Sequence, residues 1–139
     1  MSVSPRDAET ILRTFRRIAV VGVSGRPDGP SHYVSRYLID AGYDVVPVNP
    51  MLTRVHERAC YPDLRAIPAP IEVVDIFRRS ELVPPVVDEA IAIGAAAIWM
   101  QDGVVHDGAA AKARAAGLVV VMDRCMLRDH GALGPGPAR

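Results

Sequence analysis

The stretch that decides the fold spans residues 17 to 25 and reads Arg17-Ile18-Ala19-Val20-Val21-Gly22-Val23-Ser24-Gly25. A short apolar run rich in β-branched residues is typical of a buried strand, and this one ends in a glycine-containing loop. A helical pattern opens a few residues later, at Ser31. Glycines let backbone N–H groups approach a phosphate, and a helix start carries partial positive charge. The stretch therefore predicts a strand, loop and helix that bind a nucleotide phosphate.

Strands and helices alternate along the rest of the chain. The β-branched runs are Ile18–Gly22, Asp44–Asn49, Glu72–Phe77, Ala96–Met100 and Leu118–Met122. The helical patterns are Ala8–Phe15, Ser31–Ala41, Pro84–Ile93 and Asp107–Ala116, and a glycine, a common helix stop, follows each of the last three. Apolar strands alternating with helices indicate a parallel sheet covered on both faces. We predict an α/β fold, a Rossmann-like doubly wound parallel sheet of about five strands.

The strand order and the chain ends follow less directly from the sequence than the strands and helices do. A first strand that carries the phosphate loop favours the order 3-2-1-4-5 over the flavodoxin-like order 2-1-3-4-5. The connection Pro50–Ile71 is unusually long, contains four prolines and has one weak helical turn at Asp63–Ala66. A loop of this length is usually functional or mobile. Residues 131–139 are rich in glycine and proline and are predicted to be a disordered tail, which leaves residues 1–130 as a single domain.

Composition limits the classes of partner. The chain has 139 residues, with 16 basic and 16 acidic side chains, so no net charge favours nucleic acid or an anionic membrane. Its apolar stretches are shorter than the ~20 residues that span a bilayer. The two cysteines, Cys60 and Cys125, form no disulfide framework, and the histidines lack metal-ligand spacing. We therefore expect a soluble, reduced, cytoplasmic protein without a metal, which holds any anionic ligand locally.

Polar residues around the first loop fit a diphosphate. Ser24 and Arg26 lie in the loop, and Ser31, His32 and Tyr33 begin the following helix. Together they supply hydroxyls, a guanidinium and backbone donors. Ser31 is also expected to be the helix N-cap whether or not a ligand binds.

The end of the second predicted strand bears on which nucleotide binds. NAD-binding sheets usually place an acidic residue there to accept ribose hydroxyls, whereas this chain has Asn49 followed by Pro50. An amide does not repel a nearby phosphate, which favours an adenosine nucleotide phosphorylated near its ribose. The alternative is that Asn49 only stabilises a turn before proline.

Three further strand ends carry polar or aromatic groups. Phe77 and Arg78 end the third strand, Trp99 and Gln101 the fourth, and Cys125 follows the fifth. Ligands of open α/β sheets bind at the carboxyl ends of the strands. Phe77 could stack on an adenine and Arg78 could bind phosphate, while Trp99 taken alone is more often part of a core rim.

Several motifs together resemble the small stand-alone CoA-binding proteins of bacteria and archaea, which are similar to the N-terminal CoA-binding domain of the succinyl-CoA synthetase alpha subunit. The resemblance covers roughly residues 10–130 and rests on Val-Gly-Val-Ser from Val21, Val-Asn-Pro from Val48, Val-Asp-Ile-Phe-Arg-Arg-Ser from Val74, Trp-Met-Gln-Asp-Gly-Val from Trp99 and Val-Met-Asp-Arg-Cys from Val121. It implies CoA or an acyl-CoA as ligand.

The resemblance also implies a role for each region of the site. The CoA phosphates would lie at Gly22, Val23, Ser24, Gly25, Arg26, Ser31, His32 and Tyr33, the nucleotide at Asn49 and Pro50, the adenine at Phe77 and Arg78, and the pantetheine arm at Trp99 and Gln101. Cys125 is expected to be a further ligand-binding residue at this edge. The family commonly has a lysine after Asn-Pro, where this chain has Met51. A contact with the CoA 3′-phosphate would then require Arg54 or Arg58.

The function expected from these residues is a CoA carrier, sensor or regulatory module without catalysis of its own. One alternative is an NAD(H)-binding regulatory or redox protein. Another is a small CoA-dependent thiol enzyme that uses Cys125, with Arg124 beside it and His130 five residues on. A milder hypothesis is a mixed disulfide between Cys125 and the CoA thiol. An exposed apolar helix face would allow a homodimer.

Overall fold

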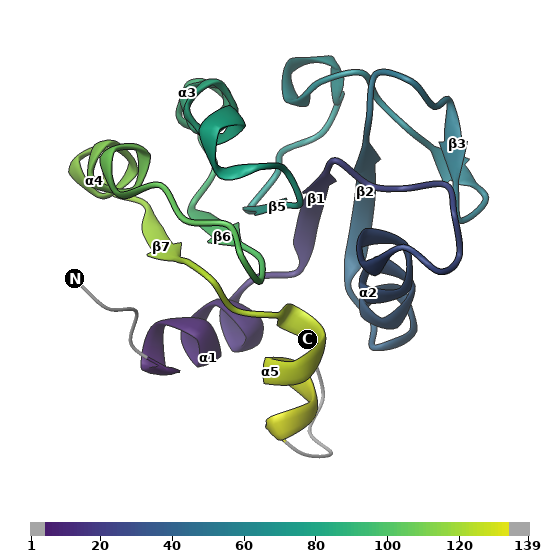
Figure 1. Cartoon of the computed structure of the whole chain (residues 1–139), viewed down its shortest axis with the longest axis horizontal. Coiled ribbons are helices and arrows are strands. Elements are labelled where there is room, and N and C mark those ends of the chain that lie inside the picture. The colour runs from purple at the N-terminus through teal and green to yellow at the C-terminus, as the bar shows by residue number, and fades with distance from the viewer. Residues whose placement is uncertain (1–4, 134–139) are drawn as a thin grey trace.

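The computed structural model describes residues 5–133, which form one parallel sheet with helices on both faces (Figure 1). The strands of this five-stranded sheet are β1 (Arg17–Val21), β2 (Asp44–Val48), β5 (Val73–Ile76), β6 (Ala97–Met100) and β7 (Val119–Val121). A small antiparallel hairpin, β3 (Arg54–Val55) and β4 (Arg58–Ala59), lies in the long connection after β2. The predicted α/β fold with a sheet of five parallel strands is therefore confirmed.

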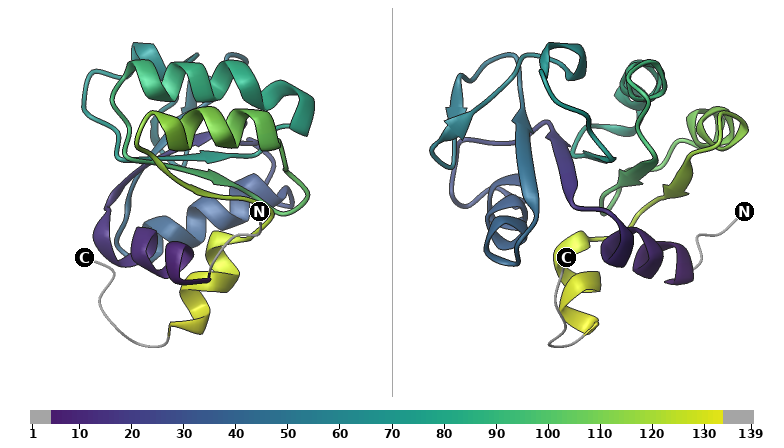
Figure 2. Two further views of the ribbon diagram at one scale, coloured as in Figure 1. Left: turned by 90° about the vertical axis from the view of Figure 1, so that its left-hand side faces the viewer. Right: turned by 180° about the vertical axis from the view of Figure 1, so that it is seen from behind.

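The sheet separates the hydrophobic core into two layers, each covered by helices (Figure 2). One face of the sheet is covered by α3 (Val83–Ala92) and α4 (Asp107–Ala115), together with the 3₁₀ turn η1 (Leu64–Ala66). The other is covered by α1 (Pro5–Thr14), α2 (Pro30–Asp40) and α5 (Met126–Ala132). A second 3₁₀ turn, η2 (Ser80–Leu82), precedes α3. No helix within residues 5–133 combines the length and apolarity needed to cross a membrane.

The predicted strand order was wrong. The sheet runs β2-β1-β5-β6-β7, which is 2-1-3-4-5 when the parallel strands are numbered along the chain. The third strand pairs with β1 on the side away from β2, with Ile18 opposite Val73. The long connection after β2 carries the chain across β1, and apolar periodicity does not encode the side to which it returns. In both orders the end of the first strand lies where the chain direction across the sheet reverses, so the phosphate loop alone could not decide between them.

Local differences from the predicted elements are small except at the C-terminal end. The predicted helical turn after the hairpin is confirmed as η1, and Gly42, Gly94 and Gly117 follow their helices with positive φ, as expected. Helix α5 was not predicted, and it includes Gly131 and Ala132, so the predicted tail begins too early. The rest of that tail, residues 134–139, lies outside the described residues.

Asp75 is a buried acid in the central strand β5. Asp75 is paired with Val20 of β1 on one side and with Trp99 of β6 on the other, and its side chain is fully buried. Neither carboxyl oxygen has a hydrogen-bond partner among residues 5–133. Burial raises the pKa of this carboxyl well above its ordinary value. The group is therefore neutral in the folded protein at pH values where the unfolded chain has already ionised it.

We predict that Asp75→Asn stabilises the protein at neutral pH. Because the folded pKa is raised, this group's contribution to stability is complete below the unfolded pKa and is lost as pH rises toward the folded pKa, by about 1.4 kcal/mol per pH unit in that window. The variant should unfold at higher urea concentration than the natural protein at pH 7, and the gap should close toward about pH 4. Parallel pH profiles for the two proteins would contradict this.

Candidate functional site

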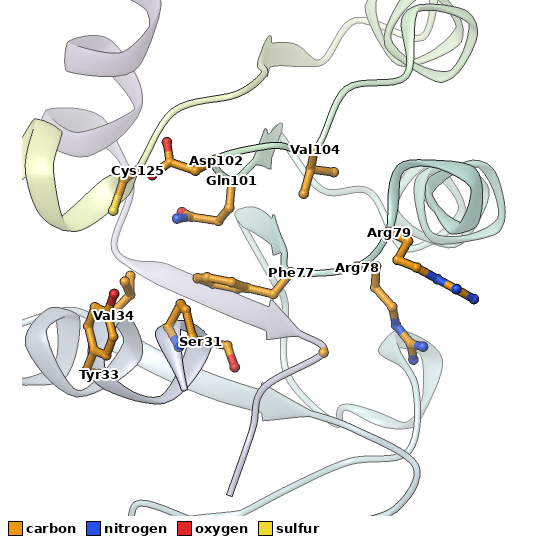
Figure 3. Close-up of a pocket in the computed structure, with 12 residues that line it drawn as sticks. Ser31, Tyr33, Val34, Phe77, Arg78, Arg79, Gln101, Asp102, Val104 and Cys125 are labelled. Carbon is orange, nitrogen blue, oxygen red and sulfur yellow. The ribbon is translucent and has the colours of Figure 1, made fainter. Parts of the chain in front are cut away.

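A cavity of about 460 Å³ lies at the carboxyl edge of the sheet, between the ends of β1, β5, β6 and β7 (Figure 3). Its lining comes from the β1–α2 segment, from the segments that follow β5 and β6, and from the start of α5. The lining residues are Gly22, Pro30, Ser31, Tyr33, Val34, Phe77, Arg78, Arg79, Gln101, Asp102, Val104 and Cys125. Apolar and cationic side chains thus meet in one cavity at the edge where α/β sheets bind ligands.

Gly22 shapes the start of this cavity. Its φ is +87°, and a Cβ built on it would lie 2.3 Å from the Phe77 carbonyl oxygen. Its N–H donates to the Val48 carbonyl at 2.9 Å, and Phe77 N–H donates to Val21 at 2.9 Å. The ends of β1, β2 and β5 are therefore joined at a point where only glycine fits.

The loop after Gly22 is held by serine hydroxyls. The Ser24 N–H donates to Ser31 Oγ at 2.7 Å, and the Arg26 N–H donates to Ser24 Oγ at 3.0 Å. The N-cap of α2 is Gly29 rather than Ser31, so the predicted cap was wrong: Pro30 occupies the first helical turn and the Ser31 hydroxyl is used by the loop. Gly29 offers no side-chain cap, and the Ser31 N–H has no acceptor within residues 5–133. The start of α2 therefore has a donor available to an anion.

Asn49 holds the loop from the other side. Its Nδ2 donates to the Val23 carbonyl at 2.8 Å, and its Oδ1 accepts from Met51 N–H at 2.7 Å. Asn49 and Pro50 do not line the cavity. Both polar ends of this amide are engaged, so Asn49 supports the loop and the turn before Met51, which agrees with the turn-stabilising alternative.

His32 faces the hairpin rather than the cavity. Its ring lies 4.3 Å from that of His56, centroid to centroid, and His56 Nε2 lies 2.8 Å from Ser35 Oγ. Burial lowers the pKa of His56, and the nearby His32, Arg36 and Arg58 lower it further. This contact fixes the hairpin β3–β4 on α2.

Phe77 and Gln101 stand side by side on the face covered by α1, α2 and α5. Ile76 pairs with Met100, so the next residues of the two strands are neighbours, and the Gln101 N–H donates to the Ile76 carbonyl at 3.3 Å. Only 3% of Gln101 is exposed. Its Oε1 accepts from Met126 N–H at 3.3 Å, whereas its Nε2 has no partner among the described residues. Figure 3 shows the amide end turned toward Cys125.

Trp99, which was predicted to lie on the pantetheine path, does not line this cavity. It is fully buried, and its Nε1 donates to the Arg124 carbonyl at 2.8 Å. Side chains two residues apart on a strand share a face. Gln101 therefore reaches the cavity, whereas Trp99 lies two residues earlier on the same face, farther from the carboxyl edge. Its hydrogen bond to Arg124 holds the segment that carries Cys125.

Of the two arginines that line the cavity, Arg78 has no ion-pair partner among the described residues. Its side chain makes no ion pair or hydrogen bond within residues 5–133, and its Nε is buried without a partner. Arg79 Nε lies 3.7 Å from Glu81 Oε2. The Asp102 carboxylate accepts hydrogen bonds from Arg128 Nη2 at 2.8 Å and from Arg128 Nη1 at 3.0 Å. The Arg128 hydrogen bond lowers the pKa of the Asp102 carboxyl. Arg78 is thus the side chain best placed to bind a ligand phosphate.

The groups expected to activate Cys125 are engaged elsewhere. Arg124 donates to both carboxyl oxygens of Asp129, at 2.7 and 3.0 Å. His130 Nδ1 lies 2.8 Å from the Tyr37 hydroxyl, and burial lowers the pKa of this histidine. The structure therefore gives the thiol-enzyme alternative no base hydrogen-bonded to Cys125 within residues 5–133.

The structure brings only part of the predicted site together. The predicted residues that line the cavity are Gly22, Ser31, Tyr33, Phe77, Arg78, Gln101 and Cys125, whereas Val23, Ser24, Gly25, Arg26, His32, Asn49, Pro50 and Trp99 do not. The sequence analysis missed Pro30, Val34, Arg79, Asp102 and Val104. Arg79, Asp102 and Val104 lie inside the quoted motifs but were given no role, and Val34 lies one helical turn after Ser31.

Comparison with known proteins identifies the family of this chain. Residues 16–131 match the sequence model of a family described as the CoA binding domain. The chain belongs to this CoA-binding domain family. It is 39% identical over 127 residues to the uncharacterized protein YneT of Bacillus subtilis, covering 91% of this chain and 94% of YneT.

Solved structures show the same fold in close relatives. A hypothetical protein from Pyrococcus horikoshii is 41% identical with a TM-score of 0.90, covering 94% of this chain and 92% of that one. The structure of cell-free ID.343 from Thermus thermophilus is 30% identical with a TM-score of 0.88, covering 94% of this chain and 99% of that one. The fold is therefore shared over nearly the whole of this chain and of those chains.

We predict that Gly22→Ala disrupts the site more than a matched glycine substitution does. Gly117 also has positive φ, +96°, but a Cβ built on it would meet nothing within 4 Å. Gly117→Ala should lose about 1–2 kcal/mol of stability from backbone strain alone. Gly22→Ala should lose about 1–3 kcal/mol more, because the methyl group collides with the Phe77 carbonyl. Urea unfolding measures both, and equal losses would refute the close approach.

Proposed function

We propose that this protein binds coenzyme A or an acyl-CoA at the carboxyl edge of its sheet. The diphosphate would lie at the β1–α2 loop and the start of α2, and the pantetheine arm would occupy the cavity along Phe77 and Gln101. The observation that carries the proposal is the form of the cavity: it begins at an uncapped helix N-terminus and continues between apolar side chains. CoA has the matching sequence of an anionic end and a long, mostly apolar arm.

The positive groups of the site support an anionic ligand. The chain has no net charge, so attraction must come from local groups. Arg78 and the start of α2 both line the cavity, and neither the Arg78 side chain nor the Ser31 N–H has a protein partner within residues 5–133. A diphosphate between them would supply the missing acceptors.

The structure also bears on the 3′-phosphate of CoA. Met51, at the position where the family resemblance implies a lysine, is 84% exposed. The two candidate replacements are engaged: Arg54 Nη2 donates to the Glu57 carbonyl and Arg58 Nη1 to the Val45 carbonyl, each at 2.8 Å. We infer that the 3′-phosphate contributes little to affinity, so dephospho-CoA should bind about as well as CoA.

NAD(H) is the second candidate ligand, and Asn49 disfavours it. In NAD-binding sheets the acidic residue at the end of the second strand accepts the ribose hydroxyls. Here the Asn49 amide nitrogen donates to Val23 and its oxygen accepts from Met51. The one amide oxygen is neutral and already accepts a hydrogen bond, so it is a poorer acceptor for two ribose hydroxyls than a carboxylate.

We further propose that the protein acts in the cytoplasm as a CoA carrier, sensor or regulatory module. The cavity supplies groups that bind and orient a ligand, namely Arg78, Gln101 and the start of α2. Whether two copies associate is tested by measuring the mass of the protein in solution with and without CoA.

We predict that Arg78→Gln weakens CoA binding about ten- to 100-fold, because a charged hydrogen bond to phosphate is worth about 1.5–3 kcal/mol. The matched control is Arg114→Gln, which removes an exposed arginine near the end of α4, on the opposite face of the sheet, and should leave affinity unchanged. Isothermal calorimetry with CoA, dephospho-CoA, NAD and ATP provides the measurement. Binding of NAD without binding of CoA would overturn the proposal, and equal affinities of both variants would remove Arg78 from the site.

A further inference from the structure

The two cysteines of the chain differ in where they lie and hardly at all in exposure. Cys60 and Cys125 are each 8% exposed, and both thiols are free. Cys125 lines the cavity, whereas Cys60 does not and directs its Sγ toward the Asn49 carbonyl at 3.7 Å. The chain therefore offers one thiol at the candidate ligand site and a second, equally buried thiol away from it.

Gln101 supplies an independent indication that a ligand group lies beside Cys125. The Met126 N–H can only donate, so the oxygen of the Gln101 amide must face it, and the Nε2 must face the cavity. Gln101 is 3% exposed, and no described residue accepts a hydrogen bond from its Nε2. A ligand that fills the cavity would bury this donor, which is costly unless the ligand itself supplies an acceptor. The arrangement is complete when a ligand brings a carbonyl oxygen to Gln101.

The pantetheine arm carries such a carbonyl next to its sulfur. Its last amide directly precedes the terminal ethanethiol group, so a carbonyl bound to Gln101 places the sulfur a short distance further along. The amide end of Gln101 is turned toward Cys125, and its oxygen is fixed by Met126, the residue after that cysteine (Figure 3). A CoA molecule bound in this way would bring its sulfur and Cys125 Sγ to the same end of the cavity.

We propose that Cys125 forms a reversible mixed disulfide with CoA by exchange with a CoA disulfide. This inference rests on the CoA-binding function proposed above and adds to it a redox-dependent, covalent state of the same site. The protein would then distinguish oxidised from reduced CoA, since the reduced thiol binds only non-covalently while the disulfide leaves one CoA attached.

The exchange balances without a further oxidant. The Cys125 thiolate attacks one sulfur of the CoA disulfide, a new bond forms between Sγ and that sulfur, and the original sulfur–sulfur bond breaks. The second CoA leaves as a thiolate and takes up the proton that Cys125 released. Any excess of a small thiol reverses the step. The rate gain comes from binding, which holds the two sulfurs close, because Arg124 and His130 are engaged by Asp129 and Tyr37.

The test compares modification by CoA disulfide in the full-length protein and in two cysteine variants. Intact-mass spectrometry and peptide mapping should find one CoA on Cys125 in the natural protein and in Cys60→Ser, and none in Cys125→Ser. Oxidised glutathione, a disulfide without the nucleotide, should react at least about ten-fold more slowly. CoA lacking its sulfur should slow the reaction with CoA disulfide by occupying the site.

A second variant separates placement of the ligand from reactivity of the thiol. Gln101→Leu should slow exchange with CoA disulfide about ten-fold, the effect of losing one hydrogen bond of about 1.4 kcal/mol. It should leave the reaction with oxidised glutathione unchanged, a contrast that a general change in thiol reactivity would not produce. Equal slowing with both disulfides would overturn the role given to Gln101.

Calorimetry with reduced CoA on the same samples distinguishes the two levels of the proposal. If CoA binds but Cys125 acquires no adduct, or acquires it no faster than from oxidised glutathione, the mixed disulfide is refuted and the CoA-binding function stands. If CoA does not bind, both are refuted. Modification of Cys60 in place of Cys125 would also overturn the inference.

Discussion

The close approach of Gly22 to the Phe77 carbonyl is the contact on which the carboxyl edge of this protein depends. A side chain at Gly22 would place its Cβ 2.3 Å from that oxygen. The same residue donates its N–H to Val48, and Phe77 donates its own to Val21, so the ends of β2, β1 and β5 are fixed relative to one another. The loop that leaves Gly22 and the ring of Phe77 therefore start from one rigid point, and the cavity opens between them.

The polar side chains near Gly22 mostly form hydrogen bonds with backbone groups of the neighbouring loops. Ser31 and Ser24 accept hydrogen bonds from loop N–H groups, and Asn49 binds Val23 and Met51. A loop held in this way needs little ordering when a ligand arrives, which reduces the entropic cost of binding. The Arg78 side chain and the amide nitrogen of Gln101, which have no protein partner within residues 5–133, belong to residues that line the cavity. Ligand recognition would therefore depend on a few free groups placed by many engaged ones.

Much of the fold could be predicted from the sequence because the apolar strands and the glycines after the helices are local signals. The strand order could not, since the connection after β2 can return to either side of β1. Within the site, Gly22, Phe77 and Gln101 could be placed because they end predicted strands. Trp99 could not, because its ring is covered by the unpredicted helix α5 and by the segment before it, where the Arg124 carbonyl accepts its Nε1–H. Asn49 was recognised as important, but only the folded loop shows that both ends of its amide are engaged.

The most direct test of the account is a crystal structure of the protein with CoA. The account predicts the diphosphate at the start of α2, within hydrogen-bond distance of the Ser31 N–H and of Arg78. It also predicts the pantetheine arm beside Phe77, with an amide carbonyl on Gln101 and the sulfur next to Cys125. A CoA molecule bound outside this cavity, or one whose phosphates contact neither the start of α2 nor Arg78, would contradict it.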